Sequence, residues 1–285
     1  MEAIAASNTA SLNEICRILD VSRSAYYAWH QAEPTTQEKN DGELLSLVCM
    51  IFHKHRRRYG ARRIAEELHD CGHACGRHRV SKLLKIQGLR AIQPKSFKPR
   101  TTESRHRLGF SPNLLLESEE PIAINRLWVG DITYVPLMGG VFSYLATLMD
   151  RFSRRIVGWQ LGEDMTESLV LAALTMAIRT RSPEPQLIHH TDRGGQYAGS
   201  EYRSVLRRAE MRQSMSRAGD CYDNAFMESC FGTIKTELEM TEYENHGAAL
   251  SEIKQYLAYY NLERKHSALG YLTPTQFENL NQMPN

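Results

Sequence analysis

Three acidic residues occupy positions where a carboxylate would be costly unless it bound something. Asp131 lies inside WVGDITYV, whose β-branched and aromatic residues predict a strand, where a charge is normally excluded. Asp192 directly follows the apolar strand expected in PQLIHHTD, at the carboxyl end where open α/β sheets bind ligands. Glu228 belongs to DNAFMESCFGTIKTEL, whose apolar spacing predicts an amphipathic helix. There are 60 residues between Asp131 and Asp192 and 35 between Asp192 and Glu228.

Three carboxylates that converge from two strands and a helix repel one another unless a cation lies among them. Mg²⁺ prefers oxygen ligands and typically takes one or two carboxylates together with water and phosphate. Two such ions, roughly 3.5–4 Å apart, activate the attacking oxygen and stabilise the leaving oxygen of a phosphodiester. Any one of these acids alone would more simply be a surface or capping residue. The three together favour a site for two Mg²⁺ ions, with Mn²⁺ as the expected substitute.

The helix that carries Glu228 also carries other groups on the same side. At about 100° per residue, Asn224, Gly232 and Lys235 fall within roughly 80° of Glu228. We expect Asn224 and Lys235 to contact DNA and Gly232 to leave room for a DNA strand. The adjoining apolar stripe, expected to be buried, is formed by Met227, Phe231, Ile234 and Leu238.

Other titratable residues nearby fit the metal site less well. Asp150 also ends a strand, but its spacing does not match the three acids. Asp220 and Asp223 directly precede the helix, where N-caps are expected. His189 and His190 flank Asp192, and neither is expected to act as a general base.

The elements that must position these side chains follow the order β-β-β-α-β-α-β-α after Pro121. Hairpins come first and βαβ units follow, which predicts a mixed five-stranded sheet with helices on both faces. A further helix is expected over residues 247–262, followed by a loop-rich tail. The fold class is therefore α/β.

Residues 53–107 are strongly basic, since they hold 16 of the 35 Lys and Arg residues but only 4 of the 33 Asp and Glu residues. Such a segment suggests a polyanion-binding module, with a solvated charged surface as the plainer alternative. Within it, YGARRIAEELHDCGHACGRHRVSKLLKIQGLRA predicts a helix-turn-helix in which Gly88 ends the second helix. That second helix would present four cations to a major groove, namely Arg77, Arg79, Lys82 and Lys85.

A second, shorter helical pair is expected over residues 11–30, with Ser22 capping its second helix. Its small core would be formed by Ile15, Ile18, Leu19 and Val21.

The stretch HDCGHACGRH, residues 69–78, brings five His and Cys residues together. Zinc is an alternative for this cluster, because thiolate and imidazole suit that metal. Without a CxxC pair, however, turn residues between two helices are the preferred interpretation.

Composition excludes several classes of protein. The chain is 42% hydrophobic and 24% charged, which is typical of globular domains. The longest apolar run, LVLAALTMAI, is too short to span a bilayer. The N-terminus has no basic segment and apolar core of a secretory signal. Six cysteines without framework spacing fit reduced thiols in a cytosol, so a cytoplasmic protein is expected.

Several motifs in combination resemble one family. They are W-x-x-D-I-T-Y, H-x-D-R-G-x-Q-Y, D-N-A-x-x-E-S, the D…D-35-E spacing, and Y-G-x-R-R-I in the basic segment. The tail YLAYYNLERKHSALGYLTPTQF is similar to Y-x-x-Y-Y-N-x-x-R-x-H-x-x-L-G-x-x-T-P-x-x-F. Together they resemble the second-frame protein of the insertion-sequence-three family of bacterial transposases, over nearly the whole chain from about residue 11.

The resemblance implies a ribonuclease-H-like core, similar to retroviral integrase, preceded by a helix-turn-helix region. It implies that Asp131, Asp192 and Glu228 are the catalytic residues and the ligands of Mg²⁺. Lys235 then matches the family's basic residue that contacts DNA near the cut. The expected activity is that of a DDE transposase, which cleaves strands at insertion-sequence ends and transfers them in DNA transposition and integration.

The resemblance also implies partners. Double-stranded DNA is expected, both as terminal repeats and as target, bound by a homo-oligomer in the bacterial cytoplasm at the nucleoid. A first-frame partner protein or fusion is expected as well, because this chain has no sustained heptad run. No membrane is involved.

Four parts are predicted along the chain: a helical segment over 1–45, a basic helix-turn-helix domain over 46–105, a linker over 106–121 and the catalytic core over 122–285. Two other functions stay open from the residues alone. A ribonuclease-H-type nuclease would use the same core without strand transfer. A non-enzymatic DNA-binding regulator would explain residues 11–107 but leave three carboxylates without a role.

Overall fold

The structure, a computed structural model, describes residues 11–31, 33, 36–94, 109–116, 118–217 and 225–282. The chain divides into two compact units. The first comprises Met1–Arg56 and Gly60–Arg90, and the second comprises Arg57–Tyr59 and Ala91–Asn285. None of the helices within the described ranges is both long and apolar enough to cross a bilayer.

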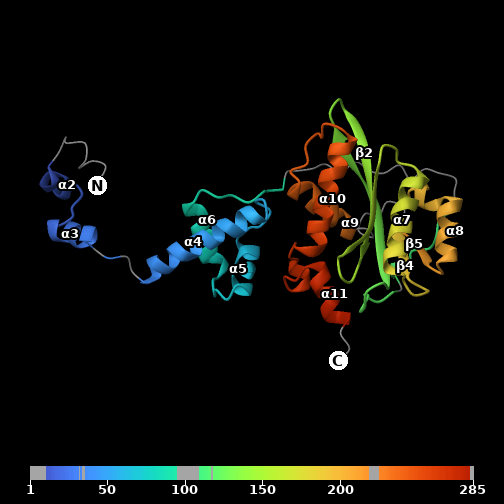
Figure 1. The fold of residues 1–285 in the computed structure, drawn as a ribbon, viewed down its shortest axis with the longest axis horizontal. Coiled ribbons are helices and arrows are strands. Elements are labelled where there is room, and N and C mark those ends of the chain that lie inside the picture. The colour runs from blue at the N-terminus through green and yellow to red at the C-terminus, as the bar shows by residue number, and fades with distance from the viewer. Residues whose placement is uncertain are drawn as a thin grey trace. The chain divides into compact units, whose positions relative to one another are not determined.

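The first unit is helical, and three of its helices pack on one another (Figure 1). They are α4 (Thr36–Lys54), α5 (Ala61–Asp70) and α6 (Arg77–Ile86). The apolar stripes expected on α5 and α6 are buried, and Gly88 follows α6 with a φ of +65°. The helix-turn-helix predicted there is confirmed. Helix α4 was not predicted, and it runs without a break through residue 45, where a domain boundary was expected.

Two short helices, α2 (Leu12–Ile18) and α3 (Arg23–Gln31), form the expected helical pair. The Ser22 hydroxyl accepts a hydrogen bond from the Ala25 amide at 3.1 Å, so it caps α3 as expected. The core expected for this pair is confirmed for Ile15 and wrong for the other three residues. Such short helices bury only a narrow face, and it is occupied by Ile15, Cys16 and Tyr26, leaving Ile18, Leu19 and Val21 exposed.

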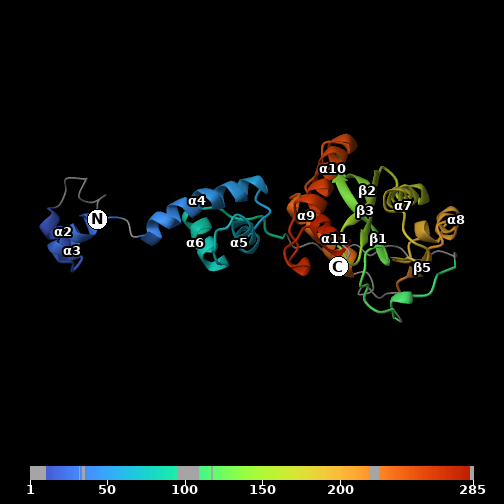
Figure 2. The same cartoon turned by 60° about the horizontal axis from the view of Figure 1, so that its bottom comes forward.

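The second unit is built on a five-stranded sheet with the order β3-β2-β1-β4-β5 (Figures 1 and 2). Strands β1 (Leu127–Leu137), β2 (Val141–Asp150) and β3 (Ile156–Gly162) are antiparallel neighbours. Strands β4 (Ile188–Thr191) and β5 (Arg212–Met215) run parallel to β1. The predicted mixed sheet is thus confirmed, with β1 at its centre.

Helices cover both faces of this sheet (Figure 1). One face carries α7 (Glu167–Arg181) and α8 (Ser200–Arg208), and the other carries α9 (Ala225–Glu237) and α10 (His246–Leu262). Successive strand residues point to opposite faces. Ile132 and its cross-strand partner Ala146 belong to the core beneath α7. Asp131 therefore points to the opposite face, the one covered by α9 and α10.

The α7 face is packed so closely that one strand position must be glycine. A Cβ atom added to Gly158 in β3 would lie 2.3 Å from the carbonyl oxygen of Ala173 in α7. Such a contact with backbone would force the helix off the sheet. Gly158 thus sets how near α7 lies to β3, and with it the thickness of this half of the core.

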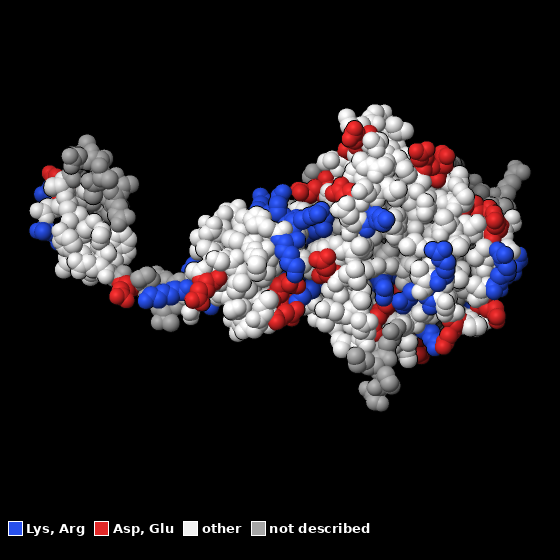
Figure 3. Space-filling model, viewed as in Figure 1, with Lys and Arg blue, Asp and Glu red and all other residues white. Residues whose placement is uncertain are grey.

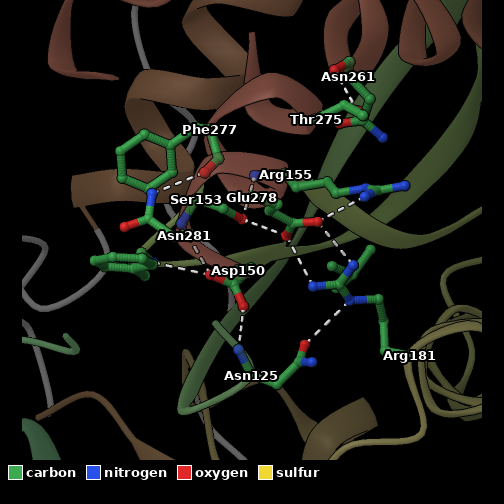
Figure 4. A network of polar contacts seen from close by, with 12 residues as sticks. Asn125, Asp150, Ser153, Arg155, Arg181, Asn261, Thr275, Phe277, Glu278 and Asn281 are labelled. Atoms are coloured by element: carbon green, nitrogen blue, oxygen red, sulfur yellow. Dashed lines mark hydrogen bonds and ion pairs between the residues drawn. The ribbon is translucent and has the colours of Figure 1, made fainter. Parts of the chain in front are cut away.

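The tail after α10 contains a helix, α11 (Pro274–Gln282), where only a loop-rich stretch was expected. Its start follows the capping-box rule: the Gln276 amide donates to the Thr273 hydroxyl, and the Thr273 amide donates to the Gln276 side chain. Proline at the first helical position completes this signature. Helix α11 is tied to the sheet through Glu278, which pairs with Arg155 and Arg181 (Figure 4).

Candidate active site

Asp131 lies in the middle of the central strand, half buried on the face that α9 covers. Strand β1 pairs with β2 through Asp131 and beyond, and with β4 over Leu127–Val129, so both of its edges are paired up to two residues before Asp131. Its Oδ1 accepts a hydrogen bond from the amide of Ile132 at 2.8 Å. The carboxylate is therefore presented from the paired backbone of the central strand, on a regular element as a precise site requires.

Asp192 is the first residue after β4. The parallel register pairs Val129 of β1 with His190 of β4. Two residues farther along each strand come Asp131 and Asp192, so the register leads both acids to one end of the strand pair. The Asp192 Oδ1 accepts a hydrogen bond from the Gly194 amide at 2.9 Å, which turns the chain just beyond the strand.

Glu228 comes from α9, which packs against β1. The four residues expected to form the apolar stripe of this helix are buried. Glu228 is exposed, and Lys235 is half buried and lies on the same side of the helix, roughly 10 Å along its axis. Between them, Gly232 is exposed, and a Cβ atom added there would meet nothing within 4 Å. No neighbouring atom of this chain therefore requires a glycine at that position.

The charges of these residues act on one another. The pKa of Asp131 is raised well above its ordinary value, chiefly by burial, then by the Asp192 carboxylate and to a smaller degree by that of Glu228. The hydrogen bond from Ile132 and the charge of Lys235 oppose this rise. Burial lowers the pKa of Lys235, and Asp131 in turn raises it. The pKa of Asp131 thus depends on the charges of two further acids, Asp192 and Glu228, and of one base, Lys235.

The donors at this site suit a hard divalent cation, because all three are carboxylates. Mg²⁺ typically needs only one or two of them together with water and phosphate. In the part of the chain that the structure describes, no three His, Cys, Asp or Glu side chains form a ready-made cage for one ion. A donor set made of carboxylates suits a cation that keeps oxygen ligands of its own, such as one bound to phosphate.

The two histidines beside Asp192 are buried and hydrogen bonded. The Nε2 of His189 lies 2.6 Å from the Tyr202 hydroxyl. His190 lies between the hydroxyls of Ser214, at 2.8 Å, and Ser216, at 3.1 Å. Burial, and then the neighbouring His190, lower the pKa of His189 to about 3. Both side chains thus brace the end of β4.

We expect His189 to make the second unit sensitive to acid. Its pKa is about 3 in the fold and 6.5 ordinarily, so the unfolded chain takes up a proton first as the pH falls. Below pH ~6.5 the free energy of unfolding should therefore fall by up to about 1.4 kcal/mol per pH unit from this residue. His189→Gln should remove that slope, measured by urea unfolding followed through tryptophan fluorescence at pH 7 and pH 5.

Tyr202→Phe provides the matched control for this titration. It removes the hydroxyl that lies against His189 but keeps the imidazole. It should lower stability similarly at both pH values and leave the slope as in the parent. A slope in His189→Gln equal to that of the parent would show that another group causes the acid sensitivity.

The residues expected to contact DNA are placed unequally. Arg77, Lys82 and Lys85 are exposed on α6, whereas Arg79 forms an ion pair with Asp41 of α4 at 2.6 Å. Asn224 lies outside the described residues. On the face of the second unit shown in Figure 3, Lys and Arg are interspersed with Asp and Glu rather than gathered in one patch.

The sequence did not predict the buried charged residues that hold α9 on the side away from Glu228. Glu237, at the end of α9, is 7% exposed and pairs with Arg264, which is 4% exposed. The signal was present in part, because Glu237 follows Ile234 by three residues and so falls on the buried stripe. A charge at such a position needs a partner, but nothing in the sequence says which cation supplies it.

Three models of protein families match parts of this chain. Residues 39–97 match an HTH-like domain. Residues 123–221 and residues 209–274 match two models described as integrase core domain. The matched core contains all three acids of the candidate site.

Relatives cover nearly the whole chain. The "insertion element IS600 uncharacterized 31 kDa protein" of Shigella sonnei is 42% identical over 273 residues, or 94% of this chain and 99% of the relative. Transposase InsF for insertion sequence IS3A of Escherichia coli K12 is 37% identical over 275 residues, or 95% of each. Among solved structures, the HTLV-2 integrase catalytic core domain in complex with magnesium is 18% identical, with a TM-score of 0.44, and covers 55% of this chain and 98% of its own. At these levels of identity to its curated relatives, the chain belongs to the insertion-sequence-three (IS3) family of transposases and carries an integrase core domain of ribonuclease-H-like fold.

Proposed function

We propose that this transposase cuts DNA at the ends of its insertion sequence and transfers the freed 3′ ends by metal-dependent DDE chemistry. One observation carries the proposal: the parallel register of β1 and β4 leads Asp131 and Asp192 to one end of this strand pair, and α9, which carries Glu228 and Lys235, packs against β1. Three acids and a base are thereby carried by two neighbouring strands and the helix that covers them. That combination suits a substrate that is itself a phosphodiester bound with cations.

In this proposal Asp131, Asp192 and Glu228 hold two Mg²⁺ ions, for which Mn²⁺ substitutes. Such ions, when bound, activate an attacking oxygen and stabilise the leaving oxygen of a phosphodiester. Asp131 fixes the position of the site because it lies on the central strand. Lys235 binds a phosphate of the DNA strand near the cut, and Asn224 is proposed to contact the same strand. The open space beside Gly232 lets that strand approach the helix.

The first unit is proposed to recognise the terminal repeats. The exposed Arg77, Lys82 and Lys85 of α6 are available to a DNA groove, whereas Arg79 would have to leave Asp41 to reach it. The division into segments 1–45, 46–105, 106–121 and 122–285 stays a prediction, with α4 crossing its first boundary. Transfer of two ends requires both to be held at once, so a homo-oligomer on double-stranded DNA is proposed. A first-frame protein is proposed as a further partner or fusion.

The test is a cleavage and joining assay with the full chain. Purified protein is incubated with a labelled duplex carrying the element's own terminal repeat, in Mg²⁺, Mn²⁺ or a chelator. A duplex of scrambled sequence is the control. We expect nicked strands and longer, joined strands from the terminal repeat, with either metal and not with the chelator. The same incubations are repeated with the first-frame protein added.

The products separate the candidate functions. Nicked strands that are never joined would indicate a nuclease of the ribonuclease H type rather than a transposase reaction. Sequence-specific binding without cleavage under every condition would indicate a DNA-binding regulator. Either result would overturn the proposal.

A further inference from the structure

The orientation of α9 is what places Glu228 opposite Asp131. A catalytic constellation works only when its groups are held within about 0.5 Å of the productive geometry. Apolar packing is non-directional, so the buried stripe of α9 by itself leaves rotation and sliding of the helix poorly determined. A directional contact on the buried side of the helix would remove that freedom.

Glu237 makes such a contact. It lies nine residues after Glu228 on the same helix, which at about 100° per residue places it on the opposite side. Lys235, by the same measure, lies on the side of Glu228. Glu237 is 7% exposed, so its carboxylate is buried. Helix α9 thus carries a site residue, Glu228, on one side and a buried carboxylate, that of Glu237, on the opposite side.

The anchor is a bidentate ion pair. Arg264 donates from Nε to both oxygens of Glu237, at 3.0 and 2.9 Å, and from Nη2 to Oε1 at 2.8 Å. Tyr256 of α10 donates its hydroxyl to Oε2 at 3.0 Å. Burial opposes the charge of Arg264, but the Glu237 carboxylate outweighs it and raises the pKa of the guanidinium. The guanidinium of Arg264 therefore stays charged, and three hydrogen bonds hold it to Glu237 in one geometry.

The backbone at the same end of α9 is held too. Arg58, which belongs to the same compact unit, donates from Nε to the carbonyl oxygen of Glu237 at 3.1 Å. Its guanidinium lies over the rings of Tyr256 and Tyr259, 4.9 and 4.7 Å from their centres. The last turn of α9 is thus fixed both through its side chain and through its backbone.

We propose that Glu237 and Arg264 are positioning residues for the active site, which hold α9 in the rotation that aims Glu228 and Lys235 at Asp131. The inference rests on the proposed function, because it assigns a task in that reaction. A buried ion pair adds little stability compared with well-packed apolar side chains, and its best-attested use is to specify one arrangement. The fork of Arg264 meeting both oxygens of Glu237 supplies that specification.

The test uses the full chain with Glu237→Gln, Arg264→Lys and the double change Glu237→Met with Arg264→Met. Mn²⁺ binding is measured by electron paramagnetic resonance, and strand joining is measured at saturating DNA. For Glu237→Gln we expect Mn²⁺ affinity and joining rate to fall about 10-fold or more, as for partners that orient metal ligands. DNA affinity should stay that of the parent. Arg264→Lys, which keeps the charge but loses the fork, should also lose rate.

Glu278→Gln is the matched control, because it disturbs a buried ion pair of the same unit whose partners, Arg155 and Arg181, lie outside α9. It should lower thermal stability while leaving Mn²⁺ affinity as in the parent. The double methionine variant should regain thermal stability but not joining. If it regains both, the pair is merely structural and the inference is wrong. Glu237→Gln with parental Mn²⁺ affinity would also overturn it, whereas a parent that neither binds Mn²⁺ nor joins strands would contradict the proposed function itself.

Discussion

Asp131→Asn, Asp192→Asn and Glu228→Gln should each reduce strand cleavage and joining by ~10³-fold or more, as removal of a residue that acts as part of a catalytic unit does. Each change replaces an anionic oxygen ligand by a neutral amide of nearly the same shape. The change therefore removes affinity for a hard cation without creating a cavity. The measurement is the joining rate on a terminal-repeat duplex in Mg²⁺, with protein folding checked by circular dichroism.

The stability of Asp131→Asn shows whether its expected loss of joining activity is caused by misfolding. Burial, followed by the Asp192 carboxylate, raises the pKa of Asp131. A carboxyl with a raised folded pKa stabilises the fold below its unfolded pKa, and that stabilisation is lost as the pH rises through the folded pKa. At pH 7 in a chelator the charged form is thus unfavourable. Asp131→Asn should have a higher free energy of unfolding than the parent and yet be inactive.

Glu201→Gln is the control for the loss of an acid. Glu201 is exposed on α8, on the sheet face opposite the candidate site. It should join strands as the parent does. Full activity in any of the three site variants would show that the acid concerned is not a metal ligand.

Glu278→Ala should lower the free energy of unfolding of the second unit by about 3–5 kcal/mol, the usual cost of breaking a buried ion pair from one side. Glu278 is 1% exposed. It accepts two hydrogen bonds from Arg181, at 2.8 and 2.9 Å, and one from Arg155 at 2.6 Å (Figure 4). Ser153 donates a further one at 2.8 Å. Its removal leaves Arg181 with a buried charge and no carboxylate.

Urea unfolding followed by tryptophan fluorescence measures this effect. The matched control is Glu184→Ala, which removes the partner of Arg126 from an exposed ion pair, with side chains 75% and 56% exposed. Exposed pairs contribute at most about 1 kcal/mol, so Glu184→Ala should be nearly neutral. If Glu278→Ala costs no more than Glu184→Ala, α11 is not held to the sheet by this carboxylate.

Much of the fold could be predicted because local pattern and tertiary packing agree. The β-branched and aromatic residues of WVGDITYV mark β1, and the apolar stripe that includes Met227 and Ile234 marks α9 and is buried as expected. In the first unit, the stripes of α5 and α6 were equally clear. Where a short apolar segment could bury more than one face, the apolar pattern did not predict which residues are buried. Ile18 is apolar and yet 76% exposed, because α2 and α3 are too short to cover it.

Other misses were of a different kind. The residues from Thr273 to Gln276 carry a capping-box signature for the start of α11. A loop was predicted there instead, because turn residues surround this signature. Helix α4 begins amid charged residues, and no single local feature marked it.

Sequence by itself determined the chemistry available to this protein: three carboxylates and a lysine at fixed spacings, on elements whose periodicity predicts which way they face. The pairing of β1 with β4, which leads Asp131 and Asp192 to one end of the two strands, came from the tertiary structure. Only the tertiary structure decided which charged residues form ion pairs. Glu237 pairs with Arg264, and Glu278 pairs with Arg155 and Arg181. The physical reason is that the strength of an ion pair depends on distance and burial in space. Neither is encoded by separation along the chain.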